Sequence, residues 1–288
     1  TYVWFDALIN YLSGLGYPDA PEFAKFWPGA QHLIAKDILK PHGIYWPTML
    51  KGMGLEPFQH LNVHGYWQMA QGKMSKSLGN VVDPGSLVGR YGLDQVRYFF
   101  LREMVFGLDA QFSEAALTTR INADLANNLG NFVSRVLAMQ QKYFTGVVQP
   151  LSANWAAEDV ELRDRFAQAE NQLKDDMKEL HFHRALEAIW SALDHANRYI
   201  VQTAPFTMIK DTQKQARVGE VLHHLLEVVR TLARVLAPFM PETAVALREL
   251  LAVIDDGLTA PWGQGLAAGH KINPPRVLFP RIDTDAKK

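Results

Sequence analysis

The chain has 288 residues, enough for one large domain or two of ordinary size. Hydrophobic residues make up 48% and charged residues 20%, a globular composition that excludes a disordered chain, a collagen-like fibre and a low-complexity tail. The net charge of -1 excludes a strongly basic nucleic-acid coat but not a local binding site, and the 0 cysteines exclude disulfides, a thiol nucleophile and zinc held by cysteine.

The first third of the chain has the texture of an α/β layer, with short apolar runs between glycines and prolines. Strands that alternate with helices in this way usually pair in parallel. The turn sequence Asp83-Pro84-Gly85 closes this stretch, and helical spacing returns over 93–105. The predicted elements before that turn are a strand at 2–5, a helix at 7–15, a strand at 32–35, a helix at 44–53 and a strand at 61–69.

After Phe112 the pattern becomes that of a helical bundle. Ser113-Glu114 precedes a helix predicted to run to about Phe144, because its apolar residues recur close to every 3.6 positions. Long helices with short connections pack antiparallel into bundles. Further helices are predicted at about 156–180, 183–202 and 213–236, and from Pro241 onward.

The two ends of the chain carry separate signals. The N-terminus lacks an initiator Met and a basic leader, and the α/β part is small for a complete doubly wound sheet. We therefore expect a fragment. No apolar run reaches the length that a membrane span needs, so no membrane association is expected.

The string Lys73-Met74-Ser75-Lys76-Ser77 is the strongest functional signal in the sequence. Two lysines three apart, with one serine between them and one directly after, suit a mobile clamp on phosphate, because each lysine is a flexible point charge. A bare Lys-x-x-Lys would more often be a solvated loop. The sequence LGNVVDP that follows directly favours the phosphate interpretation.

This string resembles the second signature of class I aminoacyl-tRNA synthetases, and other segments are similar to the methionyl-tRNA synthetase family. Those segments, in the order in which they occur, are YVWFDALINY at 2–11, HLIAKDILKPH at 32–42, NADLANNLGN at 122–131 and LFPRI at 278–282. The resemblance covers essentially the whole chain. It implies the second half of a Rossmann-like catalytic domain followed by an α-helical anticodon-binding bundle.

An aromatic set near the N-terminus is a candidate amino-acid site. Trp4 and Tyr11 are seven apart, and His42 and Trp46 are four apart, so helices would place each pair on one face. Rings suit the sulfur of methionine, although residues of this kind are more often simply core. The resemblance assigns to a methionine pocket Trp4, Ala7, Leu8, Tyr11, Ile38, His42 and Trp46.

The resemblance also implies an ATP site. Asp37 would accept from the adenylate ribose, where the sequence alone favours a helix N-cap, and the backbone of Trp67 would meet adenine. Lys73 and Lys76 would be catalytic, with Ser75 and Ser77 beside them on the triphosphate. ATP with Mg²⁺ is the expected substrate, and no zinc is expected.

A polar stripe on the long helix is the candidate RNA contact. Asn131 and Arg135 are four apart, so they share a helix face that would otherwise read as a solvated surface. The resemblance implies that both contact the anticodon. Pro205-Phe206 matches the family's Pro-Trp pair, and stacking on a base remains available to the smaller ring.

The resemblance as a whole predicts a cytoplasmic methionine–tRNA ligase whose partners are methionine, ATP and tRNA(Met). The oligomeric state is left open, with a monomer favoured for this fragment. Residues 1–112 would be the C-terminal half of the catalytic domain, 113–253 the anticodon-binding domain and 254–288 a tail that packs back on the core. No His-x-Gly-His signature is present, so the fragment alone should be inactive. The alternatives are another synthetase of the same branch, a non-catalytic tRNA-binding module, and a helical protein-interaction domain, which would leave residues 73–77 unexplained.

Overall fold

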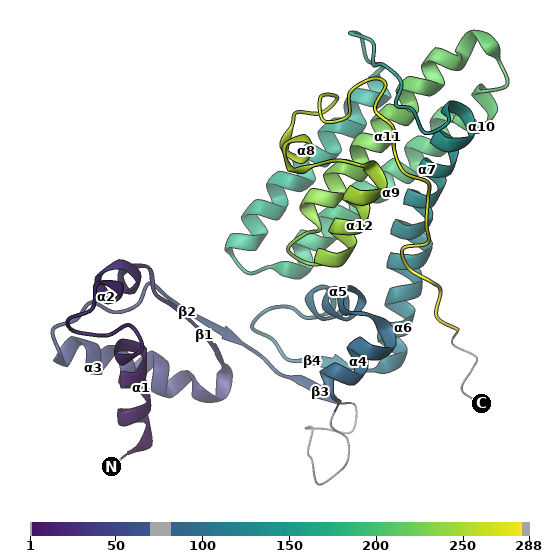
Figure 1. Cartoon of the computed structure of the whole chain (residues 1–288). Coiled ribbons are helices and arrows are strands. Elements are labelled where there is room, and N and C mark those ends of the chain that lie inside the picture. The colour runs from purple at the N-terminus through teal and green to yellow at the C-terminus, as the bar shows by residue number, and fades with distance from the viewer. Residues whose placement is uncertain (1, 70–81, 284–288) are drawn as a thin grey trace. The chain divides into compact units, whose positions relative to one another are not determined.

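The structure is a computed structural model that describes residues 2–69 and 82–283 (Figure 1). The chain forms two compact units, and each unit is made of two separate segments of the sequence. The first unit comprises Thr1–Gln68 and Val105–Gln111, and the second comprises Met69–Met104 and Phe112–Lys288. The predicted fold class, an α/β part followed by an all-α part, is confirmed.

The first unit is a small α/β layer. Its two strands β1 and β2 pair in parallel, with His32 opposite Leu61 in the register. Burial alternates along β1, so that His32 and Ile34 point inward. Its elements are α1 (Val3–Ser13), α2 (Pro21–Phe26), β1 (Gln31–Ala35), a π-helical turn (Pro41–Tyr45), α3 (Trp46–Gly52), β2 (His60–His64) and β3 (Trp67–Met69), which pairs with β4 (Ala110–Phe112).

The strand predicted at residues 2–5 is wrong, because α1 begins at Val3. Trp4, Leu8 and Leu12 recur every four residues, and in a helix this spacing places all three on one face. That face packs into a core shared with Trp27, Trp46 and Leu50, of which Leu8 and Leu12 are fully buried members. Burial of the stripe therefore outweighs the β-favouring composition of the first residues.

The strand predicted at 61–69 is broken in two at Gly65. A Cβ at this position would lie 2.2 Å from the backbone oxygen of Leu108, so the two backbone segments approach each other more closely than any side chain allows. The turn predicted at Asp83-Pro84-Gly85 is the start of a helix. Asp83 caps it by accepting the Ser86 backbone N–H at 2.7 Å, and Pro84 occupies the first turn.

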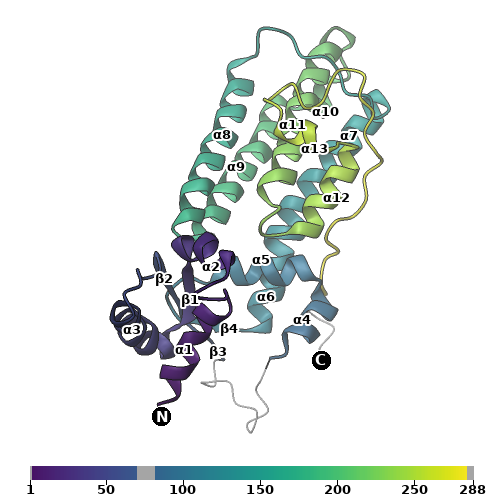
Figure 2. The same cartoon turned by 60° about the vertical axis from the view of Figure 1, so that its left-hand side comes forward.

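The second unit is a bundle of long helices (Figure 2). α8 and α9 lie side by side, and α11 is buried on nearly every face. The bounds are α4 (Pro84–Tyr91), α5 (Leu93–Glu103), α6 (Glu114–Arg120), α7 (Asn131–Phe144), α8 (Ala157–Lys178), α9 (Phe182–Thr203), α10 (Pro205–Met208), α11 (Gln215–Val235), α12 (Pro241–Leu251) and α13 (Asp255–Thr259). The four predicted long helices are confirmed to within three residues at each described end.

The longest predicted helix has a wider middle section. α6 and α7 are joined without a break by a π-helical stretch, Ile121–Gly130. The fully buried residues of this stretch, Ile121, Leu125 and Leu129, recur at intervals of four, which matches the wider turn.

The C-terminal segment returns along this long helix. Asn122 donates to the Ile282 carbonyl at 2.9 Å and accepts the Ile282 N–H at 2.8 Å. Phe279 is buried, and Arg230 on α11 donates to the Gly257 and Leu258 carbonyls at 2.9 and 2.7 Å. None of the helices over 2–69 and 82–283 is both long enough and apolar enough to span a membrane.

Candidate functional site

The predicted aromatic set comes together on one side of the first unit. The ring of His42 lies 5.6 Å from that of Trp4 and 5.8 Å from that of Tyr11, edge to face in both cases. Tyr11 and Trp46 are 5.9 Å apart. Helical spacing predicted the pairs Trp4 with Tyr11 and His42 with Trp46. In the structure the four rings lie in one cluster, although the helix that carries Trp4 and Tyr11 does not follow a strand.

Hydrogen bonds fix the orientation of Tyr11. His42 Nδ1 lies 2.9 Å from the Ile38 carbonyl oxygen, which can only accept, so Nδ1 carries the proton. His42 Nε2 is then the acceptor of the Tyr11 hydroxyl at 3.0 Å. Burial raises the pKa of Tyr11, so the hydroxyl stays protonated at neutral pH. Tyr11 is the accessible end of this chain of hydrogen bonds, with 39% of its surface exposed.

The remaining predicted pocket residues divide between surface and core. Trp4 and Ile38 are partly exposed and Ala7 is exposed. Leu8 and Trp46 belong to the buried core, so they support the accessible rings from behind.

His32 was not predicted from the sequence, and it contacts both Tyr11 and Trp46 of the aromatic set. It is buried at the centre of β1, and its ring lies 4.4 Å from both Tyr11 and Phe58. Its Nε2 accepts the indole N–H of Trp46 at 3.0 Å. Burial, and then the nearby His42, lower the pKa of His32 to about 4, so it is a neutral acceptor at pH 7. Its inward position on an alternating strand was the signal that could have found it.

A polar edge lies where the two parallel strands end. Ala35 and His64 are in register, so the residues that follow them, Asp37 and Tyr66, come to the same edge of the sheet. A hydrogen bond to Asp37 raises the pKa of Tyr66. Asp37 lies inside a short 3₁₀ turn whose N-cap is Ala35, so the capping interpretation of Asp37 is wrong.

Asp109 adds a second carboxylate at this edge, and the sequence analysis missed it. Lys36 Nζ donates to it at 2.5 Å, and the Tyr66 N–H and the Gln68 amide donate at 2.8 Å each. These hydrogen bonds, from Lys36 first, lower the pKa of Asp109. Trp67, partly buried, follows on β3. Asp109 is 73 residues from Lys36 and 43 from Tyr66 in sequence, so only the fold reveals it.

The predicted phosphate-binding residues lie outside the described residues; these are Lys73, Ser75, Lys76 and Ser77. Within the described part of the chain, His, Asp and Glu form no group of three or more that could hold a metal ion. Lys36, Asp37 and Asp109 bring charged side chains to the polar edge.

The predicted RNA stripe runs along the long helix of the second unit. Asn131 is exposed and Arg135 half-buried, without an ion-pair partner among the described residues. Asn131 lines a hollow of about 410 Å³ together with residues 277–279 of the C-terminal segment. Asn128 is not free for a ligand, because it donates to Asp194 at 2.7 Å and accepts from Asn197 at 2.8 Å.

The same contacts show how the middle of the long helix relates to α9. Asn128 meets residues 66 and 69 positions later in the chain, and Tyr98 contacts both Asp124 and Trp190, which are 66 apart. The stretch 124–128 of the long helix and α9 therefore run in the same direction where they meet. Pro205 is buried, and Phe206 is 46% exposed.

Comparisons with known proteins agree over the full chain. Residues 1–137 match the family model of class I tRNA synthetases (M), and residues 149–288 match the anticodon binding domain of methionyl tRNA ligase. The methionine–tRNA ligase of Clostridium acetobutylicum is 44% identical over 99% of this chain and 45% of its own length. That of Bacillus subtilis is 39% identical over 99% of this chain and 44% of its own length.

Solved structures give the same result. The Mycobacterium tuberculosis methionyl-tRNA synthetase in complex with methionyl-adenylate superposes with a TM-score of 0.87 at 39% identity, covering 97% of this chain and 56% of that one. The chain thus spans about half the length of the relatives that it matches. With both family models, the curated relatives and the solved fold in agreement, the chain belongs to the methionyl-tRNA synthetase family of class I aminoacyl-tRNA synthetases.

Proposed function

We propose that the full-length protein containing this chain is a methionine–tRNA ligase. It joins the carboxylate of methionine to the α-phosphate of ATP, with release of pyrophosphate, and then transfers the methionyl group from the adenylate to a hydroxyl of the terminal ribose of tRNA(Met), with release of AMP. The observation that carries this proposal is the oriented Tyr11–His42 pair inside an aromatic set, in a chain of this family. Mg²⁺ enters with ATP as part of the substrate. We favour a cytoplasmic monomer.

The methionine pocket of this proposal is the surface that Trp4, Ala7 and Tyr11 expose. A thioether packs favourably against ring edges, and Tyr11 cannot turn away while His42 holds its hydroxyl. Ile38 supplies the carbonyl that fixes the His42 ring. Leu8 and Trp46 form the buried support.

The nucleotide is held at the polar edge. Asp37 accepts from the ribose hydroxyls, and the backbone of Trp67 meets adenine. Lys73 and Lys76, with Ser75 and Ser77, close on the triphosphate and neutralise the charge that develops as pyrophosphate leaves. Asp109 keeps Lys36 beside the ribose position through their ion pair.

The anticodon is read by the second unit. Asn131 and Arg135 hydrogen-bond splayed-out RNA bases, and the ring of Phe206 stacks on one of these bases. The buried Pro205 fixes the backbone from which the Phe206 ring projects. In this proposal the catalytic part covers 1–112, the anticodon-binding domain 113–253, and the tail 254–288.

Methionine-dependent exchange of pyrophosphate into ATP tests this function. The full-length protein should exchange with methionine and not with leucine, isoleucine, valine or cysteine. The 288-residue chain alone should not exchange, because it lacks a His-x-Gly-His signature and catalysis needs both phosphate-binding walls in register. Exchange with another amino acid would assign a different synthetase. No exchange by the full-length protein, with intact binding of a CAU anticodon hairpin, would leave a non-catalytic tRNA-binding module.

A further inference from the structure

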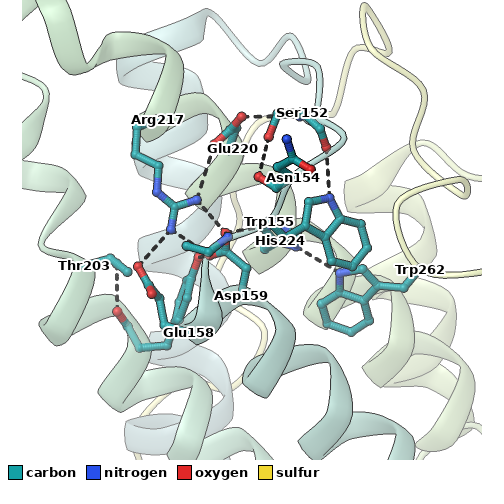
Figure 3. Close-up of polar contacts among 12 residues, drawn as sticks. Ser152, Asn154, Trp155, Glu158, Asp159, Thr203, Arg217, Glu220, His224 and Trp262 are labelled. Carbon is teal, nitrogen blue, oxygen red and sulfur yellow. Dashed lines mark hydrogen bonds and ion pairs between the residues drawn. The ribbon is translucent and has the colours of Figure 1, made fainter.

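Phe206 lies in the short segment that connects α9 to α11. The helix residues on either side of this segment hydrogen-bond to one carboxylate. Tyr199, near the end of α9, donates its hydroxyl to Asp159 at 2.5 Å. Arg217, near the start of α11, donates to both oxygens of the same carboxylate at 2.6 and 2.8 Å (Figure 3). Asp159 itself lies in the first turn of α8, so three helix ends meet at its side chain.

The carboxylate is buried and charged. The side chain of Asp159 is 1% exposed and that of Arg217 is 25% exposed. Burial opposes ionisation, but the hydrogen bonds from Arg217 and Tyr199 hold the pKa of Asp159 below its usual value. Figure 3 shows that Arg217 also reaches Glu158, at 3.1 Å. A forked guanidinium on a desolvated carboxylate fixes direction as well as distance, so this junction is rigid.

The last turn of α9 carries that rigidity to the ring of Phe206. Thr203 Oγ1 donates to the Tyr199 carbonyl at 2.7 Å, which closes the helix end. Ala204 follows in the left-handed region at φ 43°, and Pro205 is buried. These backbones leave little freedom, so the orientation of the α9 end sets where the half-exposed ring of Phe206 points.

We propose that Asp159, Arg217 and Tyr199 form a clamp that closes the base of the loop at residues 204–214 and so positions Phe206 for stacking on an RNA base. The three are positioning residues, since their polar atoms are engaged with one another and the RNA contact is made by Phe206 rather than by them. This inference rests on the proposed function, in which Phe206 contacts the anticodon.

A coupled pair of substitutions tests the clamp. Arg217→Lys keeps the charge but loses the two-pronged geometry. Binding of the 288-residue chain to an RNA hairpin with a CAU anticodon loop is measured by fluorescence anisotropy. We expect Phe206→Ala to weaken binding about tenfold or more and Arg217→Lys about fivefold. In the Phe206→Ala background, Arg217→Lys should cause no further loss, because the clamp acts only through that ring.

Two controls separate positioning from general stability. Arg234 on α11 also holds a carboxylate of α8, because it donates to both oxygens of Glu170, to one of them at 2.8 Å, but it lies 17 residues further along α11 from the loop. Arg234→Lys should leave RNA affinity unchanged. Tyr199→Phe removes one hydroxyl from the clamp and should repeat the Arg217→Lys result in a milder form, including its disappearance in the Phe206→Ala background.

The outcomes distinguish the two proposals. If the wild-type chain does not prefer the CAU hairpin to a scrambled loop, the proposed function falls and the clamp with it. If it does prefer it, but Arg217→Lys and Tyr199→Phe weaken binding equally with and without the Phe206 ring, the clamp alone is overturned. An equal loss for Arg234→Lys would also overturn it.

Discussion

Replacing His32 by leucine should loosen the aromatic set of the first unit. Leucine has similar bulk but no acceptor, so the indole N–H of the fully buried Trp46 is left without its partner at 3.0 Å. An unsatisfied buried donor costs about 1–3 kcal/mol. We expect the free energy of local opening around Trp46 to fall by that amount. If Trp46 then moves away from Tyr11, the KM for methionine should rise by between about fivefold and a hundredfold.

Two measurements check this expectation. Hydrogen exchange of the Trp46 indole N–H reports the local opening, and methionine-dependent exchange by the full-length protein reports KM. His32→Gln keeps an acceptor and should recover most of the loss, while His60→Leu, at an exposed position of β2, serves as the control. Unchanged indole exchange and KM in His32→Leu, to within about 0.5 kcal/mol, would show that His32 does not hold the set.

Four further results are expected. Lys76→Ala in the full-length protein should raise the activation free energy of methionine activation by about 2–4 kcal/mol and leave the KM for methionine unchanged. A raised KM with an unchanged kcat would instead make Lys76 a ground-state contact. Arg135→Gln should lower the preference for CAU over altered anticodons, measured as aminoacylation kcat/KM, and an intact preference would make the stripe an ordinary solvated face. Burial lowers the pKa of His224 from 6.5 to about 4, so the folded second unit holds this histidine neutral. The free energy of unfolding is therefore undiminished above pH 6.5 and falls as the pH drops from 6.5 towards 4, because only the unfolded chain takes up the proton there. Between pH 7 and 5 the loss is about 2 kcal/mol, and His224→Gln should remove that part of the acid sensitivity in urea unfolding. Arg230→Met should cost about 3–5 kcal/mol in the same assay because it leaves the fully buried Glu227 without its cation, whereas Arg276→Met, at an exposed pair with Glu249, should cost under about 1 kcal/mol.

The sequence predicted the helical part of the fold well because that part follows one local rule. Repeats of apolar residues near 3.6 located the long helices, and Pro241 correctly marked the start of α12. The same reasoning failed at residues 2–5, where the fate of a four-residue run depended on a core built from Trp27 and Leu50, far away in sequence.

The candidate site divides along the same line. Trp4, Tyr11, His42 and Trp46 could be grouped because helical spacing and a family resemblance pointed to them. His32 and Asp109 could not, since one is inconspicuous within a strand and the other joins the polar edge only through the return of the chain. The clamp at Asp159 is likewise invisible in sequence, because its partners lie 40 and 58 residues away.

The π-helical stretch Ile121–Gly130 sets the rotational phase of everything that follows it. Its wider turns let buried residues recur every four positions, and Asn131 begins the normal helix immediately afterwards. Deleting one residue there, for example Asn127, would let an ordinary helix form but would turn the downstream segment by about 100°. Arg135 would then leave the helix face on which it is proposed to contact RNA. A length change that a sequence comparison would score as minor would in this way disrupt the proposed RNA contact, so indels in this stretch should be far less tolerated than substitutions.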